Sequence, residues 1–365
     1  MTSAQPQRTP LAQAHEKLGG RMVDFAGWWM PVQYKGLKEE HANVRQNVGL
    51  FDVSHMGEVR FKGPNALPTL EWLTTNHVAK LQKGQAQYSL LPNFEGGLVD
   101  DIIIYCLEPN ADYLVCVNAA NKDKDFQWMT KNNKGAEITD ESAQWGQIAV
   151  QGPKAMELLK RVLGADVDAL KSFEVKPYEK WGGQLLFART GYTGEQGGEI
   201  FVPAALTEKL WFELLEKGAD LGVQPIGLGA RDTLRTEMKY SLYGHEIDDT
   251  TNPFEAGLGW VVKPAAKDFI GKAPMVAVKE KGLKRQLIGF ELTDKGIPRQ
   301  GYKILSPDGQ EIGVVTSGTL SPSTDKAIGI AYVAAPYAPL GSPLLVDIRG
   351  RSATAKVCET PFYKA

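Results

Sequence analysis

The chain has 365 residues, 43% hydrophobic and 23% charged, which excludes a disordered or fibrous protein and fits two or three packed domains. Its 41 basic and 43 acidic residues give a formal net charge of −2, which argues against binding to nucleic acid or a membrane surface through a general positive field. Residues 1–18 lack the apolar stretch of a signal peptide, and no apolar run approaches the ~18 residues that cross a bilayer. We expect a cytoplasmic protein.

The first two thirds of the chain mix strand and helix patterns. Alternation of apolar and polar residues predicts strands at Val59–Lys62, Val99–Cys106, Tyr113–Asn118 and Ile148–Gln151. Apolar residues at helical spacing predict helices at Pro64–Leu73, Lys122–Lys131, Pro153–Leu163 and Thr207–Lys217. Because no regular strand-helix-strand rhythm is visible, the pattern favours an α+β fold over a doubly wound sheet.

From Arg285 onward the pattern changes to short strands separated by Gly, Pro and Asp turns. The predicted strands are Leu287–Leu292, Lys303–Leu305, Gly313–Thr316, Ile328–Val333 and Leu344–Ile348. This pattern predicts a separate all-β domain of about 80 residues. We expect the linker near Lys279–Lys284.

Metal and thiol chemistry find little support in the sequence. The three cysteines have no CxxC spacing and the five histidines no HxxxH spacing, so we assign no metal site. Cys106 and Cys116 are expected to be small core residues, and each histidine a structural one. The aromatic stretch Phe25–Pro31 is also expected to belong to the core.

Two adjacent aspartates, Asp100 and Asp101, open an apolar strand after a glycine turn. Successive strand side chains point to opposite faces, so Asp101 shares a face with Ile103 and Tyr105. A carboxylate on that face needs a hydrogen-bonded or charged partner. From the spacing alone, a catalytic aspartate and an ordinary turn aspartate are equally good explanations.

The segment Gly227–Arg235 resembles a dinucleotide fingerprint but lacks its third glycine and a leading strand. On a helix, Arg231 and Arg235 lie on the side of Met238 and Leu242, opposite Asp232, Thr236 and Tyr240. Arg231 also lies in the first turn, where the helix dipole disfavours a cation. An anionic ligand and an internal salt bridge both stay open for Arg231, whereas for Arg235 we expect the salt bridge.

The stretch Thr190–Glu199 contains four glycines and two glutamates. A phosphate loop is excluded because the lysine is missing and the glutamates would repel phosphate. Glutamate suits a ligand with paired N–H donors, since an ionised carboxylate accepts two hydrogen bonds side by side. Composition alone favours the simpler interpretation of a glycine turn with solvated glutamates.

Taken together and in order, several segments resemble the aminomethyltransferase (T-protein) family of the glycine cleavage system. The resemblance covers nearly the whole chain and rests on Met22–Phe25, Gly49–Met56, Gly96–Tyr105, Gly191–Glu199, Gly227–Arg235, Leu242–Gly244 and Gly313–Pro322. Gly198 stands where a larger residue is expected in many relatives. Ser323-Thr324-Asp325 replaces a more apolar continuation, so both loops depart from the family pattern.

The resemblance implies a three-domain, cloverleaf-like, folate-binding α+β fold with a C-terminal all-β domain. Domain 1 would comprise residues 1–55 and 140–230, domain 2 residues 56–139 and 231–278, and domain 3 residues 279–365. It also implies transfer of the methylene carbon from aminomethyl-dihydrolipoyl H-protein to tetrahydrofolate. The products would be ammonia and 5,10-methylenetetrahydrofolate, in cooperation with P-protein and L-protein and without a metal, nucleic acid or membrane.

Position by position, the resemblance makes Asp101 the catalytic residue. It places folate contacts at Met56, Tyr105, Asn118, Tyr192, Glu199, Arg231 and Tyr240. Two alternatives stay open: a non-catalytic folate-binding accessory protein of the same fold, and a related folate-dependent demethylase. The accessory relatives carry a Lys-Gly-Cys-Tyr motif, whereas the comparable stretch here, Asp268–Lys272, has no cysteine.

Overall fold

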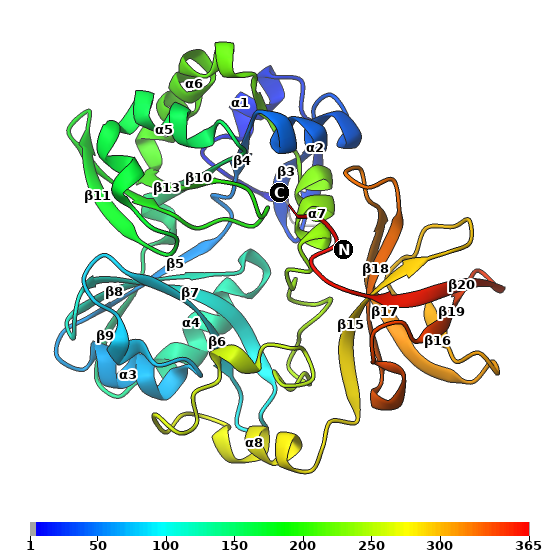
Figure 1. Cartoon of the computed structure of the whole chain (residues 1–365). Coiled ribbons are helices and arrows are strands. Elements are labelled where there is room, and N and C mark those ends of the chain that lie inside the picture. The colour runs from blue at the N-terminus through cyan, green and yellow to red at the C-terminus, as the bar shows by residue number, and fades with distance from the viewer. Residues whose placement is uncertain (1–4, 365) are drawn as a thin grey trace. The chain divides into compact units, whose positions relative to one another are not determined.

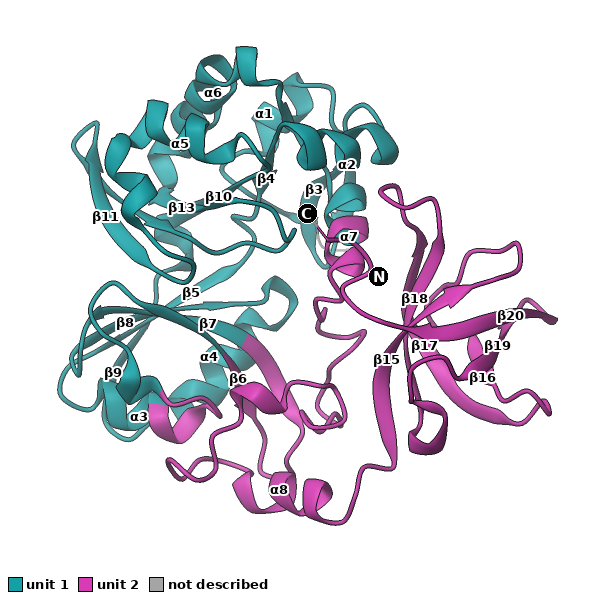
Figure 2. Cartoon of the chain, viewed as in Figure 1, with its two compact units in different colours: residues 1–70, 78–88, 102–232 teal, residues 71–77, 89–101, 233–365 magenta. Residues whose placement is uncertain are grey.

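The computed structural model describes residues 5–364. The chain forms two compact units, one of residues 1–70, 78–88 and 102–232, the other of residues 71–77, 89–101 and 233–365 (Figure 2). The start of the amino-terminal segment that lacks a signal-peptide pattern, and the last residue of the predicted third domain, lie outside the described residues. None of the described helices is long and apolar enough to cross a membrane.

The first unit contains a six-stranded sheet with the strand order β11-β12-β13-β10-β4-β14 (Figure 1). Neighbouring strands are antiparallel, except that β14 runs parallel to β4. The strands are β4 (Val48–Asp52), β10 (Trp145–Gln151), β11 (Val175–Lys180), β12 (Gly183–Ala188), β13 (Gly197–Pro203) and β14 (Val223–Pro225).

Helices α5 (Ala155–Leu163) and α6 (Thr207–Lys217) cover one face of this sheet. Their apolar stripes pack on the alternate residues of β10 and β13 that point the same way, such as Ile148 and Ile200, around the fully buried Trp211. The prediction for α6 is confirmed over the same residues, and the helix predicted from Pro153 begins two residues later.

The other set of alternate residues on β13 packs against a second sheet with the order β6-β7-β8-β5-β9. Tyr105 of β7 meets Phe201 of β13 edge to face, with ring centroids 5.3 Å apart. The strands are β5 (Gly57–Lys62), β6 (Ala86–Pro92), β7 (Leu98–Glu108), β8 (Asp112–Val117) and β9 (Glu137–Asp140). The strands predicted at 59–62, 99–106, 113–118 and 148–151 are therefore confirmed, with small shifts at their ends.

The remaining predicted helices of this region also form. They are α3 (Ala66–Leu73), shorter than predicted at its start, and α4 (Lys122–Lys131), as predicted. Single-turn 3-10 helices connect many of the elements: Val78–Lys80, Ala119–Asn121, Ser142–Gln144, Ala165–Ala169, Ala204–Leu206, Ala219–Leu221, Gly259–Val261 and Ala335–Tyr337.

A small three-stranded sheet, β1-β3-β2, lies near the amino terminus. It consists of β1 (Gln7–Arg8), β2 (Arg21–Phe25) and β3 (Trp28–Gln33), with α1 (Ala12–Lys17) and α2 (Leu37–Gln46) beside it in the sequence. The prediction that the aromatic stretch is core is only partly right. Met30 is buried, but Phe25 is 39% exposed, because it stands at the turn of the β2–β3 hairpin.

Helix α7 (Leu228–Glu237) ends earlier than the predicted amphipathic pattern requires. Lys239 adopts a left-handed φ of 56°, and the N–H groups of Lys239 and Tyr240 bond to the carbonyls of Thr236 and Arg235. This is the hydrogen-bond pattern of a Schellman helix end. The predicted helical faces therefore hold for Arg231 and Arg235 but are wrong for Met238, Tyr240 and Leu242, which follow the helix.

In the second unit, six strands form a closed barrel with the order β15-β18-β17-β16-β19-β20 (Figure 1). They are β15 (Arg285–Leu292), β16 (Lys303–Leu305), β17 (Glu311–Leu320), β18 (Ala327–Ala334), β19 (Pro343–Ile348) and β20 (Arg351–Cys358). The α+β class and the C-terminal all-β domain are confirmed, although β20 had not been predicted. The three-domain division stays a prediction.

The predicted linker at Lys279–Lys284 is too long. Helix α8 (Lys272–Glu280) includes its first two residues, so only residues 281–284 join the helix to β15. The lysine-rich composition suggested a connection, but Met275 is fully buried and anchors a short helix. The burial of Met275 therefore decides the structure here, and the lysine-rich composition does not.

Gly197 begins β13 at a point where no other residue fits. Its φ is 133°, and a Cβ atom there would lie 2.0 Å from the carbonyl oxygen of Val150. We expect Gly197→Ala to lower the free energy of unfolding by about 2–5 kcal/mol. Alanine would be strained at this positive φ, and its Cβ would overlap the Val150 carbonyl oxygen. Urea denaturation measures this loss.

Gly182 is the matched control because it also has a positive φ, 76°, but open space around its Cβ position. Gly182→Ala should cost only about 1 kcal/mol. Equal losses for the two variants would show that the close approach to Val150 is not what requires glycine.

Candidate functional site

Glu199 lies on β13 and points away from the helices, toward the second sheet. Its neighbours across the sheet are Ala149 and Ala188, two small residues that leave room for its side chain. Gly198, which precedes it, has no space for a larger residue, because a Cβ would lie 2.3 Å from the carbonyl oxygen of Ala188. With 7% exposure, Glu199 contradicts the interpretation of a solvated turn glutamate.

A short chain of two hydroxyl groups leads to one oxygen of the Glu199 carboxyl. The Thr190 hydroxyl donates a hydrogen bond to Oε2 of Glu199. The Tyr105 hydroxyl lies 3.4 Å from Thr190 Oγ1, and it donates, because the Thr190 proton is already given to Glu199. Thr190 thus links the glycine loop to β7.

Arg231, on α7, stacks over the ring of Tyr192 with its guanidinium carbon 4.8 Å from the ring centroid. Burial lowers the pKa of Arg231, while Tyr192 and Glu199 act in the opposite direction. Burial also raises the pKa of Glu199, against the Thr190 hydrogen bond and the charge of Arg231. These opposite shifts are the signature of an anion and a cation removed from water together.

Met56 and Asn118 lie at the ends of β5 and β8 in the same unit. Met56 is partly buried against the apolar cluster that includes Tyr105 and Phe201. Asn118 directly follows β8 and begins the single-turn helix before α4. Six of the predicted site residues therefore belong to the first unit: Met56, Tyr105, Asn118, Tyr192, Glu199 and Arg231.

The other two, Asp101 and Tyr240, belong to the second unit. Along β7 the burial alternates as the strand pattern requires, with Asp100 fully buried and Asp101 partly exposed. Of the two adjacent carboxylates, Asp101 is thus the one with access to a ligand. Tyr240 is 37% exposed and follows the end of α7.

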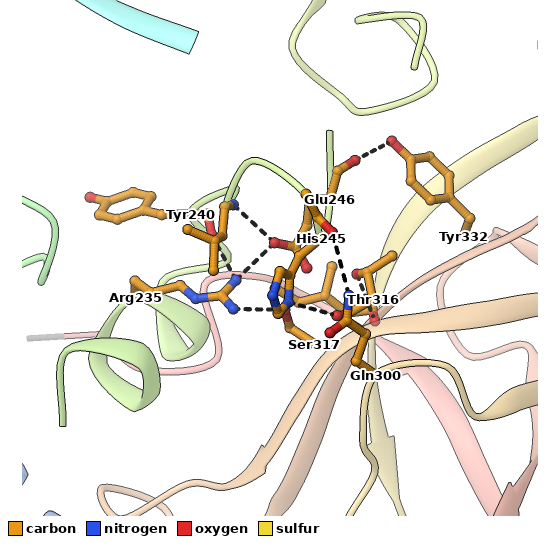
Figure 3. A network of polar contacts seen from close by, with 11 residues as sticks. Arg235, Tyr240, His245, Glu246, Gln300, Thr316, Ser317 and Tyr332 are labelled. Carbon is orange, nitrogen blue, oxygen red and sulfur yellow. Dashed lines mark hydrogen bonds and ion pairs between the residues drawn. The ribbon is translucent and has the colours of Figure 1, made fainter. Parts of the chain in front are cut away.

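A buried ion pair holds the backbone at Tyr240 (Figure 3). Arg235 donates to Glu246 at 2.8 Å and to the carbonyl oxygen of Tyr240 at 3.3 Å, and both charged side chains are at most 1% exposed. The salt bridge expected for Arg235 is confirmed. Its second guanidinium nitrogen donates to Ser317 of β17 at 2.7 Å.

The same network extends through the second unit (Figure 3). The carbonyl oxygen of Thr316 lies 3.2 Å from His245 Nδ1, and the hydroxyl of Tyr332 donates to the carbonyl oxygen of Glu246. At the end of α7, the hydroxyls of Ser321 and Ser323 donate to Glu237. Ser323, one of the departures from the family pattern, therefore has a structural role in joining its loop to the helix.

Sequence reasoning missed two polar residues of the first unit, Thr190 and Glu58. Thr190 was visible only as the first residue of the glycine loop. Glu58 alternates with Arg60 and Lys62 on β5, a pattern typical of a solvated strand face. That face is covered only at its Glu58 end: Glu58 is 1% exposed, whereas Lys62 is exposed.

Two buried histidines of the first unit, His15 and His55, have different surroundings. His15 is fully buried and bonds to Asp52 at 2.9 Å and to Tyr34 at 2.7 Å. Burial opposes ionisation of Asp52, but its bonds with His15, Ser54 and Thr9 outweigh burial and lower its pKa to about 2. Burial lowers the pKa of His55 to about 4, so this imidazole is neutral at pH 7.

Residues 5–364 contain no group of three or more His, Cys, Asp or Glu side chains close enough to hold a metal ion. Cys106 and Cys116 are buried, as expected, and neither forms a disulfide; Cys116 Sγ lies 3.7 Å from Gln147 Oε1.

Known proteins match this chain along its whole length. An aminomethyltransferase of Bdellovibrio bacteriovorus is 68% identical over 98% of this chain and 99% of its own. One from Halothermothrix orenii is 45% identical with the same coverage. The crystal structure of the glycine cleavage system aminomethyltransferase T from Bartonella henselae superposes with a TM-score of 0.92, at 32% identity over 98% of both chains.

Two family models match the chain, one after the other along the sequence. Residues 11–266 match the GCVT N-terminal domain, and residues 285–364 match the glycine cleavage T-protein C-terminal barrel domain. The fold and these matches define a folate-dependent transferase with a C-terminal β-barrel. The chain belongs to the aminomethyltransferase, or glycine cleavage T-protein, family.

We predict that the Arg235–Glu246 pair is structural. Arg235→Met should lower the free energy of unfolding by about 3–5 kcal/mol, because it leaves the Glu246 charge buried without its cation. The double variant Arg235→Met, Glu246→Leu should recover most of that loss. Urea denaturation of the three proteins tests this, and a double variant no more stable than Arg235→Met would contradict it.

Proposed function

We propose that this chain transfers the methylene carbon of an aminomethyl group, carried on the dihydrolipoyl arm of H-protein, to tetrahydrofolate. The carbon leaves sulfur and the amine nitrogen and becomes bonded to N5 and N10 of the folate. The two N–H protons end on the released thiol and on ammonia, so the products are dihydrolipoyl H-protein, ammonia and 5,10-methylenetetrahydrofolate. P-protein and L-protein would act with it in the cytoplasm.

The buried Glu199 carboxyl, with Arg231 close enough for its charge to act, gives this proposal its main structural support. A pterin presents N3–H and a 2-amino group side by side, and an ionised carboxylate accepts both hydrogen bonds. Burial makes that pairing selective, since a ligand without the two donors would leave the carboxylate unpaired. Met56, Tyr105, Asn118, Tyr192 and Tyr240 are proposed to contact the rest of the folate.

Asp101 is proposed as the catalytic residue. A carboxylate near N10 would orient N5 toward the methylene carbon and stabilise the cationic iminium that forms as ammonia leaves. Its partial exposure, in contrast to the buried Asp100, fits this role. Neither a metal nor a covalent enzyme intermediate is part of the proposal.

Asp101→Asn should keep tetrahydrofolate affinity within a few-fold but lower kcat roughly 10²–10³-fold, because the amide carries no charge to stabilise the cation. Methylenetetrahydrofolate formation from aminomethylated H-protein measures kcat. Glu108→Gln, an exposed substitution on the same strand, serves as control. Undiminished turnover of Asp101→Asn would remove Asp101 from the mechanism.

Glu199→Gln should raise the tetrahydrofolate dissociation constant by ~10–100-fold, since the amide offers one acceptor atom where the carboxylate offers two. Isothermal titration calorimetry measures the constant, with the exposed Glu179→Gln on β11 as control. An unchanged constant would count against the pterin role of Glu199.

A further inference from the structure

Glu58 is a buried carboxyl group that the residues around it do not satisfy. It is 1% exposed, and neither of its carboxyl oxygens has a hydrogen-bond partner within the described part of the chain. Buried polar side chains are nearly always hydrogen-bonded, so an exception calls for a cause. A ligand that supplies the missing partner is one such cause.

Strand register places Glu58 on the sheet face that carries the candidate site. Glu58 of β5 lies opposite Cys116 of β8, and Cys116 lies opposite Ile103 of β7. Directly opposed residues of antiparallel strands project from the same face, and Tyr105 lies two residues beyond Ile103 on that face. This face packs toward Phe201, two residues from Glu199 on β13.

The charges around Glu58 disfavour another anion. The nearby groups that act on it are Asp140 at the end of β9, Glu141, Glu199 and one cation, Lys122 of α4. Tyr105, Cys116 and Asp101 also lie on this face, as do Arg60, which pairs with Asp112, and the exposed Lys62 farther along β5. Burial first, and then the three carboxylates against a single ammonium, raise the pKa of Glu58 well above its usual value.

Glu58 and Glu199 consequently differ in how their surroundings treat the ionised form. Burial raises the pKa of both carboxyls, but Thr190 and Arg231 favour the ionised form of Glu199, whereas no donor bonds to the Glu58 carboxyl within residues 5–364. When two carboxyls in one site have environments that separate their acidities, they take different roles. The more acidic one accepts hydrogen bonds, and the neutral one donates.

We propose that Glu58 determines ligand specificity as a neutral carboxylic acid that donates a hydrogen bond to the pterin 4-oxo group. The inference rests on the proposed folate site and adds a residue to it. The 4-oxo oxygen is an acceptor next to N3–H, so one donor and one acceptor carboxyl complement this edge of the ring. Two ionised carboxylates would repel the oxygen.

The 4-oxo contact is tested with tetrahydrofolate and its 4-amino-4-deoxy analogue, in which the acceptor oxygen is replaced by a donor. Glu58→Met should weaken tetrahydrofolate binding ~10-fold or more, because the buried oxygen loses its partner. It should also reduce the discrimination between the two ligands. Glu58→Gln, which keeps a donor, should bind tetrahydrofolate within about threefold of wild type, and Glu137→Gln on the exposed edge of β9 is the control.

The pH dependence gives a second readout that a structural role would not produce. Only protonated Glu58 donates, so wild-type affinity for tetrahydrofolate should fall as pH rises through its raised pKa. Glu58→Gln cannot ionise and should lack this fall. This comparison also decides the matter if Glu58→Met does not fold.

Unchanged affinity and discrimination in a folded Glu58→Met, or the same alkaline loss in wild type and Glu58→Gln, would overturn the role of Glu58. The proposed function would survive either result, provided that the wild-type protein forms methylenetetrahydrofolate. A wild-type protein that binds no tetrahydrofolate would overturn both.

Discussion

The burial of the Glu199 carboxyl is the constraint on which the candidate site depends. A carboxylate loses several kcal/mol of hydration when it is buried unless donors and cations replace the water. Gly197 and Gly198 allow β13 to begin where no side chain fits, and Thr190 supplies a donor from the same loop. The positive charge of Arg231 completes the arrangement. Loss of the glycines, of the Thr190 donor or of the Arg231 charge would change the ionisation of the Glu199 carboxyl.

The two units differ in how far hydrogen bonds and opposite charges compensate their buried charged side chains. In the second unit, Arg235 is paired with Glu246 and also donates hydrogen bonds to Ser317 and to the Tyr240 carbonyl oxygen (Figure 3). This network stabilises the chain around Tyr240, although Oε1 of Glu246 is buried without a hydrogen-bond partner within the described part of the chain. In the first unit, Glu199 has one hydroxyl donor and Glu58 none among residues 5–364. Incomplete compensation of this kind is typical of a site that a ligand completes.

Much of the fold was readable from residue patterns, and the failures have physical reasons. Alternation predicted β7 and separated Asp101 from the buried Asp100, but the choice of Asp101 as catalytic came from the family resemblance. Helix α7 ends before its predicted end, because the apolar spacing continues past Glu237 while Lys239 turns left-handed. Glu58 was missed because period-two alternation cannot tell a solvated face from one covered by a second sheet. Such tertiary contacts lie beyond local patterns.

The most direct test of the account is a single-turnover experiment with H-protein that carries a ¹³C-labelled aminomethyl group, mixed with the protein and tetrahydrofolate. The account predicts that the label appears in 5,10-methylenetetrahydrofolate, with one ammonia released for each methylene transferred. Binding of tetrahydrofolate with all label retained on H-protein would contradict it, and would instead indicate a folate-binding protein without transferase activity.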